Sequence, residues 1–368
     1  MDVGSTVRRA VLMGLIALPC ACNDVRSDRG AEGGAVATIA SAADDSGVAQ
    51  GTLGGDGDGD AGPDSGADDG PLDGTGASVF DVGGPSGGGE TGPVINDDEC
   101  QKIDFLFVID NSGSMFNEQQ ALVSSFPGFI AAIQQKVNAQ NYQIMVVDTD
   151  AAHANLCTDV CMTLPNCFGT PCNSIPTPTV CDETLGAGVT KSSAGLECGV
   201  TAPDRFMVDA QPDVGGTFAC MGKVGITGQD VERPMDAMVE AVTSQAEPGA
   251  CNQGFLRDDA ILVVTFITDE EDDGDSLGDP ASWKQALVAA KAGNEAAVVV
   301  LGLVGDPDVM GGTCGPLGLA EPSPRLRTFA ESLQFGSWGS ICAVDYAPFF
   351  ADAVEVIDSA CEQFDPEG

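Results

Sequence analysis

Apolar residues occur along this chain in two kinds of run, short and nearly unbroken ones and longer periodic ones. The unbroken runs are 103–109 (IDFLFVI), 142–147, 261–268 (ILVVTFIT) and 296–304 (AAVVVLGLV). Runs of this length without polar alternation are typical of strands that are buried on both faces, as in parallel sheets. We therefore predict four strands and place 261–268 at the centre of the sheet.

Between these runs, apolar positions recur every three or four residues, which is the period of one face of an α-helix. The stripes are Leu122, Phe126, Ile130, Ile133 and Val137; Val231, Met235, Met238, Val242 and Ala246; and, after Tyr346, Phe350, Val354, Ile357 and Cys361. Alternation of strands with helices predicts an α/β domain with a largely parallel sheet and flanking helices.

Two further helices are indicated by their starting residues. Asp279-Pro280 and Ser323-Pro324 each combine a capping residue with a proline at the first helical position. Serine and aspartate side chains accept hydrogen bonds from free backbone N–H groups, and proline lacks the N–H that would be unsatisfied there. We predict that each pair begins a helix.

Residues 23–98 depart from this pattern. They are rich in Gly, Ala, Asp, Ser and Pro and contain one aromatic residue, Phe80. Such a segment cannot bury enough apolar surface to offset the entropy of ordering it. We predict a disordered linker.

A second departure, about 150–203, contains six cysteines, many Pro and Thr residues and few bulky apolar ones. It is much longer than ordinary connections, so crosslinks must hold its fold. Two interpretations stay open with equal weight: an insertion that shapes a partner-binding surface, and a long structural flap.

The first 22 residues have the features of a bacterial export signal. Two arginines precede the apolar run 10–18, which is too short for a permanent bilayer anchor. The following LPCAC places Cys20 and Cys22 where a lipoprotein signal has its lipidated cysteine, and the alanine before Cys22 favours that position. We predict a lipoprotein-type signal at 1–22 and a lipid anchor on Cys22, with Cys20, or secretion without lipid, as alternatives.

The remaining cysteines predict disulfides. Excluding these two from the fourteen leaves twelve, an even number, and exported proteins form disulfides readily. Zinc is the alternative, but the chain has no Cys-x-x-Cys pair and a single histidine, His153.

The charge balance excludes one class of partner. Fifteen Lys and Arg residues stand against 56 Asp and Glu residues, a net charge of −41. A chain this acidic repels phosphate backbones, so we expect no nucleic-acid partner. The acidic run 270–275, which follows the central strand, is expected to be a solvated loop, with attraction of a second cation or repulsion of an acidic partner as alternatives.

The chemistry of the chain is concentrated where strands end. Asp110, Ser112 and Ser114 follow the first strand as Asp-x-Ser-x-Ser, and Asp269 follows the central strand. Small oxygen ligands at alternate positions of a turn can face one cation, and Mg²⁺ prefers oxygen ligands. Ligands of open α/β sheets bind at the carboxyl ends of strands. A third loop brings Thr227 just before a predicted helix.

Together these features resemble the von Willebrand factor A domain with its metal-ion-dependent adhesion site, and more closely the A domains of bacterial surface lipoproteins. The resemblance covers about Cys100 to Cys361. It implies a Rossmann-like fold over 99–365 and a bridge between Cys100 and Cys361 that ties the ends of the domain. The implied metal site consists of Asp110, Ser112, Ser114, Thr227 and Asp269.

The resemblance also implies how the site works. The three hydroxyls bind Mg²⁺, or Mn²⁺ or Ca²⁺, directly, the two aspartates hold its waters, and one position stays open for a partner's acidic side chain. The family's Gly-Gly-Thr is here Gly225-Ile226-Thr227, with Gly215-Gly216-Thr217 as a rival. We prefer Thr227 because the predicted helix follows it at once.

We therefore predict a non-catalytic, divalent-cation-dependent module that binds a protein or matrix ligand. The lipid anchor and the linker would hold it at the bacterial cell envelope, on the outer membrane or cell surface. One alternative is a structural envelope protein without ion-dependent binding. The other is a metal-assisted surface hydrolase, against which the chain lacks His-Glu-x-x-His and a phosphate loop.

Overall fold

The computed structural model describes residues 102–137, 139–150, 156–167, 169–201, 204–229, 231–306, 308, 314 and 320–365. All of them belong to one compact unit, Gly87–Gly368. The signal at 1–22, the linker at 23–98, Cys20, Cys22, Cys100 and His153 lie outside the described residues.

A six-stranded sheet forms the centre of the domain, in the order β5-β2-β1-β6-β7-β8. Every neighbouring pair is parallel except β2 and β5. Its strands are β1 (Lys102–Ile109), β2 (Asn141–Asp148), β5 (Met207–Val208), β6 (Ile261–Ile267), β7 (Val298–Val304) and β8 (Phe335–Ser340). The four predicted strands are thus confirmed, and β6 is central beside β1.

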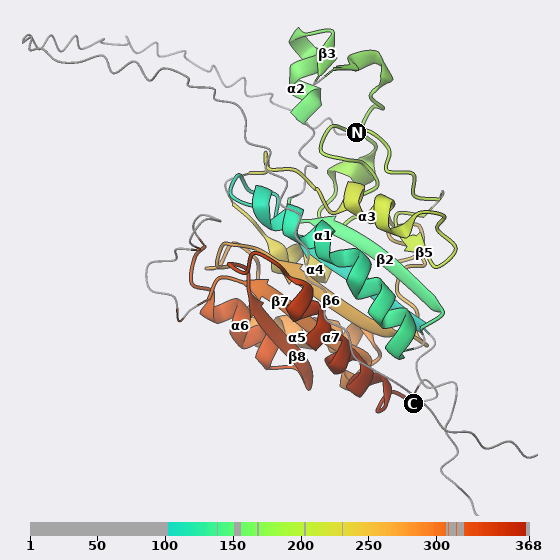
Figure 1. Ribbon diagram of the computed structural model, residues 1–368, viewed down its shortest axis with the longest axis vertical. Coiled ribbons are helices and arrows are strands. Elements are labelled where there is room, and N and C mark those ends of the chain that lie inside the picture. Colours follow the sequence, from blue (N-terminus) through green and yellow to red (C-terminus); the bar gives the residue numbers. More distant parts are fainter. Residues whose placement is uncertain are drawn as a thin grey trace, which may run out of the picture. The chain divides into compact units, whose positions relative to one another are not determined.

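Helices cover both faces of the sheet, and Figure 1 shows α1 and α7 side by side over one of them. The helices are α1 (Phe116–Ala132, continued by a π-helical turn at Ile133–Val137), α2 (Leu156–Thr163), α3 (Val214–Met221), α4 (Pro234–Val242), α5 (Pro280–Ala290), α6 (Pro324–Glu331) and α7 (Ala347–Cys361). The predicted class, α/β with a mostly parallel sheet and flanking helices, is confirmed.

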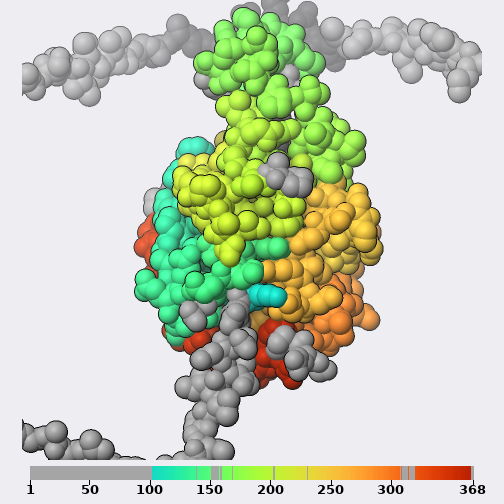
Figure 2. Space-filling view, turned by 90° about the vertical axis from the view of Figure 1, so that its right-hand side faces the viewer, coloured from blue at the N-terminus to red at the C-terminus, as the bar shows by residue number. Residues whose placement is uncertain are grey.

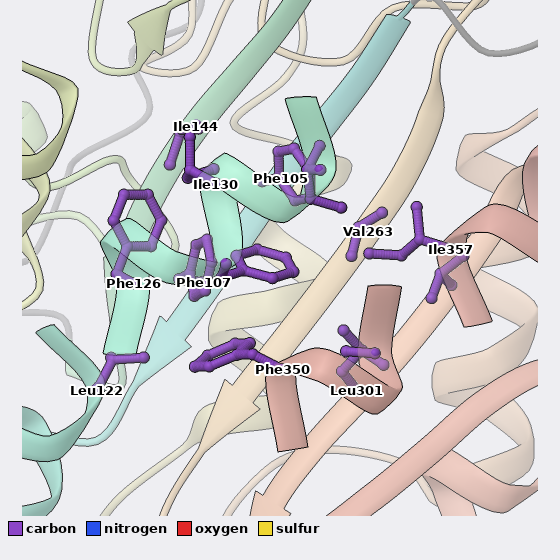
Figure 3. Close-up of a cluster of buried hydrophobic side chains, with 14 of the residues drawn as sticks. Phe105, Phe107, Leu122, Phe126, Ile130, Ile144, Val263, Leu301, Phe350 and Ile357 are labelled. Carbon is purple, nitrogen blue, oxygen red and sulfur yellow. The ribbon is translucent and has the colours of Figure 1, made fainter. Parts of the chain in front are cut away.

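The unbroken apolar runs are explained by two cores, one on each face of the sheet. On β1, Phe105 and Phe107 pack into the core under α1, α3 and α7, whereas Leu106 and Val108 pack into the core under α4, α5 and α6. Figure 3 shows the first of these cores, in which aromatic rings from β1, α1 and α7 meet. Because successive side chains of a strand alternate between faces, both faces of β1 need apolar residues.

The helix predicted around Met235 is shorter than its apolar stripe indicates. It begins at Pro234 and ends at Val242, so Val231 and Ala246 lie outside it, and Val231 is exposed. Proline at the first helical position has no N–H to leave unsatisfied, which fixes the start at Pro234. The stripes of α1 and α7 are buried as predicted.

Both helix starts before proline are confirmed, but only one is capped by the predicted side chain. Asp279 Oδ1 accepts a hydrogen bond from Ser282 N at 2.9 Å. The hydroxyl of Ser323 instead donates to the carbonyl of Glu321 at 2.9 Å. Glu271, from the loop after β6, replaces it by accepting from the backbone N–H of Arg325 at 2.7 Å.

The insertion is held by crosslinks, as predicted. Cys157–Cys167 and Cys161–Cys172 close a small unit of α2 with the two-stranded pair β3 (Asn166–Cys167) and β4 (Thr170–Pro171). Cys181–Cys251 and Cys198–Cys220 tie the rest of the insertion to the domain. Figure 2 shows the yellow-green segment of β5 and α3 lying against the teal segment of α1 and β2.

Disulfides also account for the other described cysteines. Cys314 pairs with Cys342. Cys361 is itself disulfide-bonded, and the partner expected for it, Cys100, lies outside the described residues. The pairing of Cys100 with Cys361 stays a prediction.

Candidate metal centre

The candidate site lies where the strand order reverses. Counting only the strands of the main sheet, the order is third, second, first, fourth, fifth, sixth, so β1 and β6 are neighbours from which the chain continues in opposite directions. Ligands of doubly wound sheets bind at this switch point, outside the carboxyl ends of the strands. Asp110 directly follows β1, and Asp269 lies two residues beyond β6.

Asp110 is fully buried and fixed by two hydrogen bonds. Its Oδ1 accepts from Ser112 N at 2.6 Å, and its Oδ2 accepts from the Thr268 hydroxyl at 2.6 Å. The hydroxyls of Ser112 and Ser114 lie 3.1 Å apart, and that of Ser114 donates to Asp269 Oδ1 at 3.1 Å. The structure therefore brings four of the five predicted site residues into one connected set of contacts.

The loop that carries Thr227 is packed against the same turn. Gln119 Nε2 donates to the carbonyls of Asp110 at 2.9 Å and of Gly225 at 2.6 Å. On the other side of Thr227, Gly228 N donates to the Asn111 carbonyl at 3.0 Å. A Cβ on Gly228 would lie 2.1 Å from the end of the Asn111 side chain and 2.9 Å from the Asn111 carbonyl oxygen, so this approach requires glycine. Exposed Thr227 lies between these two anchor points.

The predicted helix directly after Thr227 is absent from the described residues, although the Thr227 loop does reach the turn. No helix follows it at once, because α4 begins only at Pro234. The rival Thr217 lies inside α3, is buried, and accepts a hydrogen bond from Gln211 Nε2 at 2.9 Å. Tertiary contacts of Gly225 and Gly228, and not a helix start, bring the Thr227 segment to the site.

Both aspartates of the candidate site have raised pKa values. Burial raises the pKa of Asp110, although the hydrogen bonds from Thr268 and Ser112 oppose the shift. Burial and the charge of Asp110 raise the pKa of Asp269 to about 7. Burial is the largest cause of both shifts, and the charge of a neighbouring carboxylate adds to each of them.

Glu118, in the first turn of α1, belongs to this group and was missed from the sequence. It is buried, and its Oε2 has no hydrogen-bond partner in the described part of the chain. Burial raises its pKa, and the charge of Asp110 adds to the shift. The helical period could have indicated that Glu118 is buried, because Glu118 lies one turn before Leu122 on the buried face of α1.

Glu232 forms a second buried carboxyl group behind the Thr227 loop. The Thr149 hydroxyl donates to it, and the amide nitrogen of Asn111, in its favoured orientation, reaches both carboxyl oxygens at 3.2 and 3.3 Å. Burial, followed by the charge of Asp110, raises its pKa to about 9. Glu232 therefore keeps its proton at neutral pH and links the loop to the residue beside Asp110.

The residues at the site fit a hard divalent cation. The orphaned carboxylate oxygen of Glu118 and the raised pKa values of Asp110 and Asp269 indicate buried carboxyl groups without a compensating cation. Within the described residues, no three His, Cys, Asp or Glu side chains form a metal-ligating group. The candidate set differs from such a group because its other donors are the hydroxyls of Ser112, Ser114 and Thr227.

The acidic run after β6 is only partly the solvated loop that we expected. Glu271 and Asp272 are buried, whereas Asp273 and Asp275 are exposed. Glu271 caps α6, and Asp272 Oδ1 accepts from Ser276 N at 3.0 Å. The expectation of solvated side chains was wrong for Glu271 and Asp272. The Glu271 carboxylate caps α6, and the Asp272 carboxylate closes the loop.

Comparisons of the sequence with protein-family models and with curated proteins find no match. None of the helices in the described ranges has both the length and the hydropathy that crossing a bilayer requires.

Proposed function

We propose that this chain is a von Willebrand factor A-like module that binds a partner protein or matrix ligand through a bound divalent cation. The observation that carries the proposal is the set of contacts that runs from Asp110 through Ser112 and Ser114 to Asp269, at the switch point of the sheet. Hydroxyl and carboxylate oxygens at this position are the donor set that Mg²⁺, Mn²⁺ or Ca²⁺ accepts.

In this proposal the site residues divide into two roles. The hydroxyls of Ser112, Ser114 and Thr227 would bind the ion directly. Asp110 and Asp269 would accept hydrogen bonds from its waters and offset its positive charge. When bound, the ion supplies a positive centre that a partner's carboxylate completes. Buried Asp110 also keeps the turn in shape, since its carboxylate binds Ser112 N and the Thr268 hydroxyl at the same time.

The proposal extends to where the module acts. An anchor on Cys22 and the linker 23–98 would hold the domain away from the membrane of a bacterial envelope. The acidic composition favours solubility and attracts divalent cations loosely. The proposed role is non-catalytic, with the hydroxyls and carboxylates of the site serving as ligands of the ion and of its waters.

Calorimetric titration of the oxidised full chain with Mg²⁺, Mn²⁺ and Ca²⁺, after chelation and dialysis, tests the ion site directly. We expect one ion per chain in the parent protein and none in the Ser112→Ala, Ser114→Ala double variant. Ser124→Ala is the matched control, because Ser124 is an exposed serine of α1 that bonds to Gln120. Equal titration of the parent and the double variant would refute the site.

A further inference from the structure

A hollow of about 330 Å³ opens beside the candidate ligand Thr227. Its apolar lining comes mainly from Phe116, at the start of α1, and from Ile226, in the loop before Thr227. These side chains are 62% and 38% exposed, so both present apolar surface to solvent at the hollow. The hollow is at the lower end of the roughly 300–1,000 Å³ that small ligand sites have, so it is large enough for a bulky side chain.

This hollow adjoins the candidate metal site at Thr227. Thr227 lines it, and so does Gln119, whose amide bonds to the carbonyls of both Asp110 and Gly225. The carbonyl of Ile226 lies 3.9 Å from the position of a Cβ on Gly113, within the Asp-x-Ser-x-Ser turn. A ligand group bound beside Thr227 would therefore have the hollow within reach of its next residue.

The cysteine-rich insertion supplies one wall, through Ser193. The segment around Ser193 is a closed hairpin, because Ser192 N donates to the Leu196 carbonyl and Cys198 N to the Thr190 carbonyl, each at 2.8 Å. The disulfide Cys198–Cys220 fixes the hairpin to α3. The base of the hairpin is fixed as well, because Nζ of buried Lys191 lies 2.6 Å from Asp182 Oδ2.

A positive charge also lines the hollow. Lys223 is exposed and forms no ion pair with another residue of the described part of the chain. Only 15 Lys and Arg residues occur in this strongly acidic protein, and one of them lies beside the candidate cation site. A lysine at this position attracts the acidic groups of a ligand and repels basic ones.

We propose that the hollow binds an extended peptide segment of a partner protein in which a bulky apolar residue directly neighbours an acidic residue. The acidic side chain faces the ion, the apolar side chain fills the space between Phe116 and Ile226, and Lys223 attracts further negative charge on the segment. This inference rests on the proposed function and specifies the ligand of the same site. It also gives the insertion a function, which is to form a wall of the binding surface.

A displayed library of random heptapeptides, selected on the immobilised full chain in Mg²⁺ and released with chelator, tests the proposal. We expect released clones to be enriched in Asp or Glu next to Leu, Ile, Met or Phe. The Phe116→Ser, Ile226→Ser double variant should still select acidic residues but lose the apolar neighbour. A selected peptide should bind this variant roughly tenfold more weakly or worse, since burial of one bulky apolar side chain contributes at least that factor.

One control variant and one further test variant accompany the selection. Val180→Ser removes an exposed apolar residue of the insertion that does not line the hollow, and it should leave the selected peptide's affinity unchanged. Lys223→Glu should weaken binding and reduce its dependence on salt. Both substitutions are at exposed positions, so loss of folding does not complicate the comparison.

The outcomes separate this inference from the proposed function. Acidic enrichment without an apolar neighbour would overturn the inference and leave ion-dependent binding intact. Apolar enrichment that chelator does not release would overturn both. If no sequence is enriched, the inference is wrong, and the calorimetric titration of the ion decides the proposed function independently.

Discussion

Two buried aspartates lie at opposite ends of β1, and their surroundings differ in one respect. Asp104 is paired with Arg257, whose Nε lies 2.7 Å from its Oδ1 and whose backbone N lies 2.8 Å from its Oδ2. Asp110 has hydroxyl and N–H donors, but the side-chain charge that most affects it is that of another carboxylate, Asp150. Both side chains are fully buried.

We interpret this difference as one between a structural charge and a charge that the proposed ion would compensate. A buried carboxylate needs a cation or several hydrogen bonds, and Arg257 supplies both to Asp104. Asp110 lies near Asp269 and Glu118, since its charge raises the pKa of both. None of these three carboxyl groups has a cationic partner among the described residues. Negative charge that the fold gathers and does not neutralise is the physical argument for a cation from solution.

The largest expected effect comes from removing the cation at the structural end of β1. Arg257→Met leaves Asp104 buried without its partner, which should lower the free energy of unfolding by about 3–5 kcal/mol. Denaturant unfolding measures this, and Mg²⁺ should not change the difference. The control Lys136→Met, which removes an exposed pair with Glu355, should have little effect. A small loss for Arg257→Met would mean that the two ends of β1 do not differ as described.

The pH dependence of stability tests the Asp110 end of β1, where Glu232 contacts Asn111. Because its folded-state pKa of about 9 exceeds the ordinary 4.5, its contribution to stability is complete below about pH 4.5 and is lost as pH rises through 9. The chelated parent protein should lose at most about 1.4 kcal/mol per pH unit from this group. Glu232→Gln mimics the protonated carboxyl and should remove that slope. Equal slopes in the two proteins would contradict the assignment.

The same substitution at the two aspartates should have unequal effects. Asp104→Asn leaves Arg257 without its partner and should destabilise the protein. In chelator at pH 8, Asp110→Asn loses one of the two hydrogen bonds that its carboxylate accepts, but it also removes a buried charge without a cationic partner. Its loss of stability should therefore be smaller, by roughly 1 kcal/mol. Thermal unfolding compares the two variants directly, and an equal or larger loss for Asp110→Asn would contradict the difference between the two ends of β1.

The smallest expected effect concerns Glu118, the carboxylate that we missed from the sequence. Glu118→Gln keeps the shape of the side chain and removes its charge, so Mg²⁺ affinity should fall a few-fold, equivalent to about 1 kcal/mol or less. Calorimetry measures the change. The exposed Glu355→Gln on α7 is the matched control, and equal affinities for the two variants would remove Glu118 from the site.

The sequence predicts most of the fold because the local pattern and the tertiary structure agree. The runs at β1 and β6 contain apolar residues at both alternating sets of positions, and the stripes of α1 and α7 have a helical period. Such signals come from neighbouring residues, and burial on the sheet is their common cause. The start of α4 was predicted less well, because Pro234, and not the apolar stripe, determines where the helix begins.

Contacts between distant segments explain what the sequence could not predict. Gln119 and Gly225 are 106 residues apart, and their hydrogen bond brings the Thr227 loop to the Asp110 turn. Glu271 caps a helix that begins more than fifty residues later. Neither contact follows from spacing or composition. Asp110 and Asp269 could be placed in advance because parallel strands end at the same edge of a sheet.

The most direct test of the account is thermal unfolding of the oxidised full chain after chelation, with Mg²⁺, Mn²⁺ or Ca²⁺ restored. An ion that binds only the folded state stabilises it by roughly 2.7 kcal/mol at one hundred times its dissociation constant. We predict that rise for the parent protein and not for the Ser112→Ala, Ser114→Ala variant. No rise in the parent, or an equal rise in the variant, would contradict the cation site at the end of β1.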